Sequence, residues 1–99
     1  MSRKYVIAVK DLTPDEEKRF IKFITDNGGN WWHWVQNFWL VVDAGGTLDA
    51  GKLRDAIGLI SSRKGHNLVF QVMSMGDWAG FGPSSEKKSM FNWLRNNWF

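Results

Sequence analysis

The fold is decided by Trp31-Trp32-His33-Trp34-Val35-Gln36-Asn37-Phe38-Trp39-Leu40-Val41-Val42. Residues 31–35 and 38–42 are two runs of mostly aromatic and aliphatic side chains, a composition typical of β-strands. Two turn-tolerant residues, Gln36 and Asn37, separate the runs, and a two-residue connection is typical of a β-hairpin. The stretch therefore predicts two antiparallel strands joined by a turn at residues 36–37.

Side chains alternate across a strand, which sorts this hairpin into two faces. With the turn at 36–37, Trp34 is expected opposite Trp39, and Trp32 opposite Val41. One face is then rich in tryptophan and carries Trp32, Trp34, Trp39 and Val41. The other face is longer and mostly aliphatic, which suits packing beneath helices, and carries Trp31, His33, Val35, Phe38, Leu40 and Val42.

The sequence before the hairpin predicts a strand and a helix. Residues 5–9 form a short β-rich run. Thr13 is a good N-cap, Pro14 suits the first helical position, and Glu16 completes a capping box three residues after Thr13. The residues Asn27-Gly28-Gly29 are expected to end this helix.

The sequence after the hairpin predicts two more helices with a strand between them. Leu53, Ala56, Ile57 and Ile60 recur at helical spacing in a segment that begins at Asp49 and runs to about Ser62. Residues 68–73 form the fourth strand-like run. Ser84 or Ser85, with Glu86 close behind, is expected to cap a last helix that carries Met90, Phe91, Leu94 and Trp98.

This order of elements predicts an α+β protein with a ferredoxin-like β-α-β-β-α-β fold and an additional C-terminal helix, in a single domain over residues 1–99. Right-handed crossovers would lay both principal helices on one face of a four-stranded sheet. The same two helices can cover only one of the two faces of the sheet. We therefore expect the face with Trp32, Trp34 and Trp39 to be open unless another segment covers it.

Composition narrows the class of protein. The 99 residues include no cysteine, so the chain can form neither a disulfide framework nor a thiolate metal site. No apolar run approaches the roughly 18–20 residues that span a bilayer, and no signal-peptide core follows the N-terminus. We expect a cytoplasmic protein without a membrane partner. The net charge of +3 favours acidic partners, and seven tryptophans favour a binding surface.

Three segments carry a resemblance to a known family: Tyr5-Val6-Ile7-Ala8, the hairpin at 31–42, and Gly76-Asp77-Trp78-Ala79-Gly80-Phe81 with Trp93-Leu94. In these segments the chain resembles the small proteins related to CRISPR-associated protein two, including stand-alone members often labelled SinR-family. The resemblance implies a ferredoxin-like fold and a homodimer joined through sheet faces or edges. It also implies either metal-dependent nuclease activity or a structural role in holding nucleic acid.

Nuclease members of that family carry an aspartate at the end of the first strand. In this chain Lys10 stands where that aspartate would most simply fall, and Asp11 follows one residue later. A shift of one residue reverses the direction of a side chain unless a bulge restores it, so the departure disfavours catalysis. His33 and His66 have no ligand spacing in the sequence, and we expect no metal site.

We therefore expect a small, non-catalytic, homodimeric protein that binds nucleic acid or a nucleotide. A phage-type protein that sequesters a nucleotide signal or blocks a nuclease complex would suit this size. The expected contacts are aromatic stacking and hydrogen bonding from Trp32, Trp34, Trp39 and His33, and positive charge from Arg3, Lys4, Arg63 and Lys64 gathered at one end of the sheet.

Two alternatives remain open. The first is a metal-dependent nuclease that uses Asp11, in which case Mg²⁺ would be the cofactor; otherwise no cofactor is expected. The second is a protein–protein adaptor that binds a partner through the tryptophan-rich sheet face.

Overall fold

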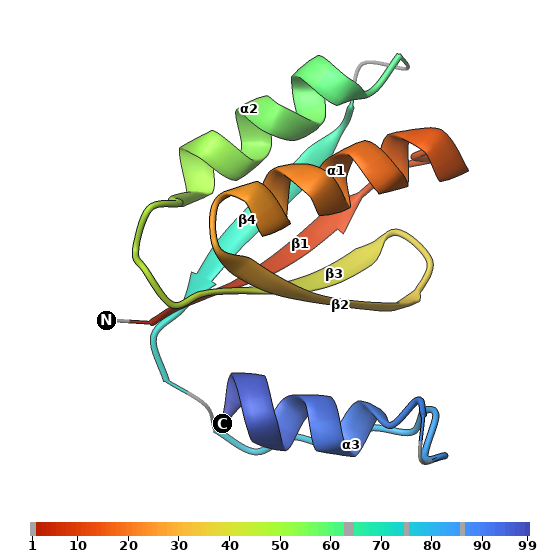
Figure 1. Ribbon diagram of the computed structural model, residues 1–99, viewed down its shortest axis with the longest axis vertical. Coiled ribbons are helices and arrows are strands. Elements are labelled where there is room, and N and C mark those ends of the chain that lie inside the picture. The colour runs from red at the N-terminus through yellow and green to blue at the C-terminus, as the bar shows by residue number, and fades with distance from the viewer. Residues whose placement is uncertain (1, 63–64, 75, 86) are drawn as a thin grey trace.

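A four-stranded antiparallel sheet lies at the centre of the computed structural model (Figure 1). The structure describes residues 2–62, 65–74, 76–85 and 87–99. The strands are β1 (Arg3–Val9), β2 (Gly29–Val35), β3 (Phe38–Asp43) and β4 (Asn67–Val72), and they lie in the order β2-β3-β1-β4. Therefore β2 and β4 are the two edge strands.

The first helix, α1 (Pro14–Asp26), begins where the capping signals predict it. The Thr13 hydroxyl accepts from the backbone N–H of Glu16 at 3.2 Å, and the Glu16 carboxylate accepts from the backbone N–H of Thr13 at 2.9 Å. This reciprocal pair satisfies two N–H groups that a helix start otherwise leaves unpaired. Gly28 has a φ of +76° just after the helix, a conformation that glycine adopts without a steric cost.

Glu16 also joins α1 to the end of the second helix, α2 (Ala50–Ile60). Its carboxylate accepts from the backbone N–H of Ser62 at 2.7 Å. The backbone N–H groups of Thr13 and then Ser62 hold the pKa of Glu16 at about 2, below its usual 4.5. The buried carboxylate is therefore charged at neutral pH and ties the two helices together.

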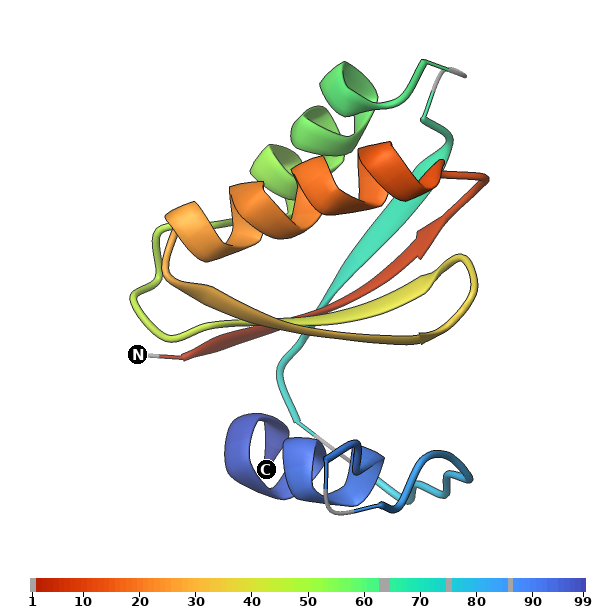
Figure 2. The ribbon, with the colours of Figure 1, turned by 45° about the vertical axis from the view of Figure 1, so that its right-hand side comes forward.

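Both helices pack on one face of the sheet, which we call the helical face (Figures 1 and 2). Asp49 caps α2 by accepting from the backbone N–H of Lys52, and the helix ends at Ile60, two residues before the predicted end. The core of this face is a cluster of almost completely buried side chains: Tyr5, Ile7, Val9, Phe20, Ile24, Trp39, Val41, Leu48, Leu53 and Ile57.

The opposite face of the sheet is covered by residues 76–99, which we call the C-terminal segment (Figures 1 and 2). Within it, α3 (Met90–Trp93) continues directly into a π-helical turn, η1 (Leu94–Trp98). A second buried cluster forms where the segment meets the sheet and consists of Trp32, Val42, Met90, Leu94 and Trp98. The C-terminal segment is therefore the further segment that covers this face, and we call this side the C-terminal face.

The last helix begins later than the sequence predicts. Ser89, not Ser84 or Ser85, is its N-cap, and the Ser89 hydroxyl accepts from the backbone N–H of Asn92. Ser84 instead forms a short antiparallel bridge with Ser89, which folds the chain back before the helix starts. Glu86, the expected partner in the cap, lies outside the described residues.

The hairpin has the predicted turn but not the predicted register. Val35 pairs with Phe38 across Gln36-Asn37, as expected, whereas Trp32 pairs with Leu40 and not with Val41. Between these two pairs β2 advances by three residues and β3 by two, so β2 contains a bulge. A bulge adds one residue to one strand and changes which side chains of the two strands share a face.

The bulge separates the three tryptophans that were expected together. Trp39 and Val41 lie on the helical face with Trp31, whereas Trp32 lies on the C-terminal face with Phe38 and Leu40. The predicted tryptophan face therefore does not exist as one surface.

The protein is thus α+β, with a four-stranded antiparallel sheet, and the arrangement is compatible with a ferredoxin-like fold. Within the described ranges, no helix is long and apolar enough to cross a membrane.

Candidate functional site at the edge of the C-terminal face

The three tryptophans predicted to bind a ligand have three different environments. Trp39 is completely buried, and its ring makes an edge contact with Phe20 at 5.1 Å between centroids. Trp32 is buried beneath the C-terminal segment. Trp34 is 44% exposed, on the edge strand β2. Of the three, only Trp34 presents a ring that a ligand can reach without rearrangement of the core.

Trp34 lies in a hollow of about 320 Å³ between β2 and the C-terminal segment, which we call the edge hollow. Its lining combines aromatic rings with lysines and small polar groups, and consists of Asn30, Trp31, Trp32, Trp34, Lys87, Lys88, Ser89 and Trp93. None of the described residues that line it is acidic. The volume is within the range of about 300–1,000 Å³ found for sites that bind small molecules.

A lysine sits directly over the exposed tryptophan. The Lys88 ammonium lies 5.3 Å from the centroid of the Trp34 ring, within the distance of a cation–π interaction. Both Lys87 and Lys88 are exposed, so their ammonium groups remain available to an anion. The hollow therefore offers an aromatic surface and positive charge at the same place, which suits a ligand with a flat ring and a negatively charged group.

Local hydrogen bonds explain why the two lysines face β2. The Ser85 hydroxyl accepts from the backbone N–H of Lys88 at 3.1 Å, which ties Lys88 to Ser85. The backbone N–H of Met90 donates to the carbonyl of Pro83 at 2.7 Å and closes the same loop. On the other side, Asn30 of β2 donates to the side chain of Asn97 at 2.8 Å.

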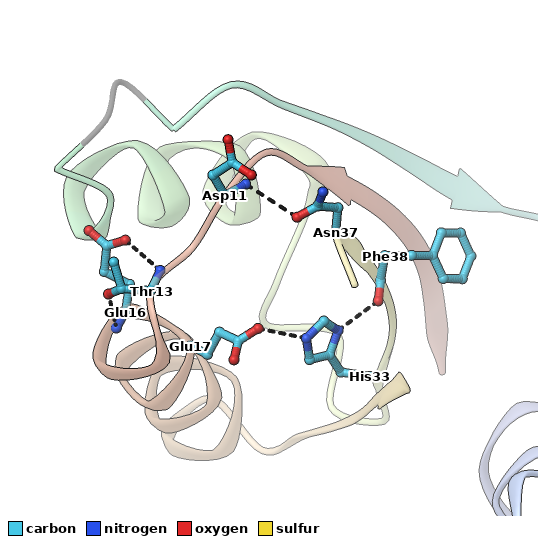
Figure 3. A network of polar contacts seen from close by, with 7 residues as sticks. All are labelled: Asp11, Thr13, Glu16, Glu17, His33, Asn37 and Phe38. Carbon is cyan, nitrogen blue, oxygen red and sulfur yellow. Dashed lines mark hydrogen bonds and ion pairs between the residues drawn. The ribbon is translucent and has the colours of Figure 1, made fainter. Parts of the chain in front are cut away.

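His33, another predicted binding residue, has both ring nitrogens occupied by the protein (Figure 3). Nδ1 lies 2.8 Å from the carbonyl oxygen of Phe38, and Nε2 lies 2.7 Å from the carboxylate of Glu17 on α1. Both ring nitrogens are therefore within hydrogen-bonding distance of an oxygen of the protein itself. The ring also stacks on Trp39, with centroids 3.8 Å apart. His33 therefore fastens the edge strand to α1.

Asp11, the candidate nuclease residue, lies in the loop after β1 (Figure 3). It has a φ of +56°, and its backbone N–H donates to the side chain of Asn37 at 3.2 Å. This bond joins the end of β1 to the hairpin turn. In the part of the chain that the structure describes, no three His, Asp or Glu side chains are grouped so as to hold a metal ion.

Of the predicted basic cluster, the structure describes only Arg3 and Lys4. The Arg3 guanidinium donates to the carbonyl of Leu48, and the Lys4 ammonium lies 6.0 Å from the centroid of the Trp98 ring. Arg63 and Lys64 lie outside the described residues. Their neighbours Ser62 and His66 bond to Glu16 and Lys10, at the end of β1 that is remote from Arg3.

The direction of the strands places the two ends of α2 near opposite ends of β1. Because β3 runs antiparallel to β1, it ends where β1 begins. The helix α2 starts near that point and runs back toward the far end of β1, so its C-terminal turn cannot meet Arg3.

Sequence reasoning missed the lysines of the edge hollow. Lys87 and Lys88 follow the predicted caps Ser84 and Ser85 and would therefore fall in the first turns of the last helix, whereas the structure places them before it. The contact of Lys88 with Trp34 spans more than fifty positions of sequence and leaves no local pattern.

Comparison with protein-family models, with curated proteins and with solved structures finds no match to this chain. The resemblance to proteins related to CRISPR-associated protein two therefore stays a prediction from the sequence.

Proposed function

We propose that the protein is a non-catalytic binding protein for a nucleotide or single-stranded nucleic acid, and that the edge hollow is its site. The observation that carries the proposal is the pairing of the exposed Trp34 ring with the Lys88 ammonium, 5.3 Å from its centroid. Lys87 lines the same hollow and adds a second positive charge.

Base stacking supplies the affinity in this proposal. A nucleobase that stacks on an exposed aromatic ring gains about 1–3 kcal/mol and needs no particular base sequence. Trp34 is 44% exposed, so a base reaches its ring once Lys88 moves aside. Lys88 and Lys87 are then free to approach the phosphate that the base carries, and each such contact releases counterions.

The proposal includes a second copy of the chain as partner and a ferredoxin-like arrangement of the elements. The strand order β2-β3-β1-β4 with α1 and α2 on one face supports the arrangement. Two exposed apolar residues on the edge strand β4, Leu68 and Phe70, support a homodimer. Light-scattering mass would test the homodimer directly.

The test is a titration of tryptophan fluorescence with short oligothymidylates and with mono- and cyclic nucleotides at two salt concentrations. We expect saturable quenching that weakens as salt rises. Trp34→Ala is expected to lower affinity about tenfold, in line with the loss of one stacked base. Lys88→Gln and Lys87→Gln are each expected to reduce the salt slope by about 0.7.

Two variants serve as matched controls. Trp78 is also 44% exposed but contacts Phe99 at 5.1 Å instead of a lysine, so Trp78→Ala is expected to leave affinity unchanged. Lys18→Gln removes an exposed lysine from α1 and is expected to leave the salt slope unchanged. Unaltered binding by Trp34→Ala, or the absence of saturable quenching by any ligand, would contradict the proposal.

A protein partner is a second candidate, favoured by exposed apolar side chains on the C-terminal side. Phe81 is fully exposed, and Met73 is largely so. Such residues are typical of protein–protein contacts when they adjoin other apolar groups. A stable complex that is insensitive to salt, with no response to nucleotides, would favour this candidate over the edge hollow.

A further inference from the structure

A pocket of about 360 Å³, partly open to solvent, lies between the sheet and the C-terminal segment beside their buried cluster, and we call it the cavity. Among the described residues that line it, only Trp32 also lines the edge hollow. Its sheet wall is formed by Val6, Trp32, Val35, Phe38, Leu40 and Val72. Its opposite wall includes Trp78, Phe81, Leu94, Trp98 and Phe99. The cavity reaches neither Trp34 nor the lysines of the edge hollow.

We propose that this cavity binds an uncharged aromatic molecule of about the size of two fused rings. The size follows from the volume, because a cavity of about 150 Å³ lined by apolar side chains accepts benzene. A volume of about 360 Å³ is more than twice as large and falls in the range of about 300–1,000 Å³ found for small-molecule sites.

The absence of charge in the ligand follows from the walls. Every described residue that lines the cavity is aliphatic, aromatic, methionine or glycine. A charged group placed there would lose its hydration without gaining a partner, which is strongly unfavourable. This chemistry is the opposite of that in the edge hollow, where two lysines favour an anion.

The aromatic character of the ligand follows from the rings on both walls. Trp32 and Phe38 lie on the sheet side, where their centroids are 6.3 Å apart in an edge contact. Trp78 and Phe99 lie on the other side at 5.1 Å. A flat molecule between them finds ring faces and ring edges on both walls, the offset and edge-to-face arrangements that aromatic pairs prefer.

Phe81 lies at the rim of the cavity and is fully exposed. Its neighbours are Gly80 and Gly82, and both pack closely on Met90, where an added Cβ would approach the methionine side chain to 3.0 Å or less. The backbone is thus held against α3 while the Phe81 ring has no large apolar group to cover it. A ligand in the cavity gives this ring a surface to pack on, and the ring then covers the ligand.

The test uses N-phenyl-1-naphthylamine, an uncharged probe whose fluorescence rises in apolar surroundings. We expect saturable binding of one probe per chain, displacement by naphthalene, and no displacement by naphthalene-2-sulfonate at the same concentration. Neither added salt nor Trp34→Ala is expected to change probe affinity. That result separates this site from the proposed nucleotide site, so either can fail without the other.

Two variants locate the probe in the cavity. Val6→Phe puts a ring into the cavity from the sheet wall and is expected to weaken probe binding at least tenfold. Leu59→Phe adds the same ring on the exposed outer side of α2 and is expected to have no effect. Phe81→Ser removes the rim ring without touching the buried clusters, and we expect about threefold weaker binding even if Val6→Phe does not fold.

The proposal is overturned by any of three results. These are no saturable rise in probe fluorescence, equal affinity in Phe81→Ser and the parent protein, and equal displacement by the sulfonate and the uncharged hydrocarbon.

Discussion

The two faces of the sheet are packed differently. On the helical face, ten side chains from strands, helices and one loop form a cluster in which none is more than 4% exposed. On the C-terminal face, five buried side chains form a smaller cluster, and a cavity of about 360 Å³ lies beside them. Exposed side chains such as Phe81 and Phe99 form part of the cavity wall, so this face is packed less completely than the helical face.

The difference separates the part of the molecule that stabilises the fold from the part that offers binding sites. Capping at Thr13, the Glu16 contacts and the His33–Glu17 pair all act on the helical face. The edge hollow and the cavity both lie where the C-terminal segment meets the sheet. The following predictions test this separation, beginning with the largest expected effect.

Truncation of one tryptophan on each face compares their packing directly. Trp39→Ala removes a completely buried ring from the helical face and is expected to lower the free energy of unfolding by about 3–5 kcal/mol. Trp98→Ala is expected to cost about half as much, because that ring borders a cavity and has fewer atoms around it. Urea denaturation measures both losses, and equal values would show that the faces are packed alike.

Acid should weaken the helical face through Glu16. The pKa of this carboxyl is lowered to about 2 from 4.5, so its charged form stabilises the folded state at pH values above about 4.5. That contribution is lost progressively as the pH falls from about 4.5 through about 2. Glu16→Gln is expected to be less stable at neutral pH and to lose this part of the pH dependence. Thermal unfolding between pH 7 and pH 2 measures both effects. If Glu16→Gln and the parent protein lost stability in parallel as the pH falls, Glu16 would not be the source of this acid sensitivity.

The His33–Glu17 pair is expected to contribute less. A double-mutant cycle with His33→Gln and Glu17→Gln should give a coupling of about 1 kcal/mol, since the pair is partly buried and charge-assisted. The cycle is measured by urea denaturation at neutral pH. The exposed pair Lys22–Asp26 on α1 is the control and should couple by no more than about 0.5 kcal/mol. Equal coupling in both pairs would contradict the inference that His33 fastens the edge strand β2 to α1 more strongly than an exposed ion pair would.

The smallest effect is expected at the edge hollow. Lys88→Gln removes the cation over Trp34 and should lower the free energy of unfolding by no more than about 0.5–1 kcal/mol. Chemical denaturation measures the change, for which Lys18→Gln on α1 is the control. A loss comparable with that of Trp39→Ala would mean that the hollow is part of the structural core.

Local signals predicted the elements of the helical face well. The start of α1 follows from Thr13, Pro14 and Glu16, whose interactions involve neighbours in sequence. The hairpin turn at Gln36-Asn37 is likewise local, and Asn37 adopts the positive φ of +64° that asparagine tolerates.

The candidate site could not be predicted in the same way, for two physical reasons. The bulge between Trp32 and Val35 adds one residue to a run in which aromatic residues occupy both alternating positions, so the sequence looks the same with or without it. The cover of the second face depends on where residues 76–99 pack, which is a tertiary contact. Only after those contacts are known do Lys87 and Lys88 come to lie beside Trp34.

The sheet is complete at Val72, and the described residues after it add no strand to the sheet. All ladder hydrogen bonds are therefore made before the C-terminal segment begins. Removal of the C-terminal segment would take away no strand, yet it would expose the side chains of Trp32 and Val42, which are now buried beneath it. The segment therefore keeps an apolar sheet surface, of the kind that favours aggregation, away from solvent.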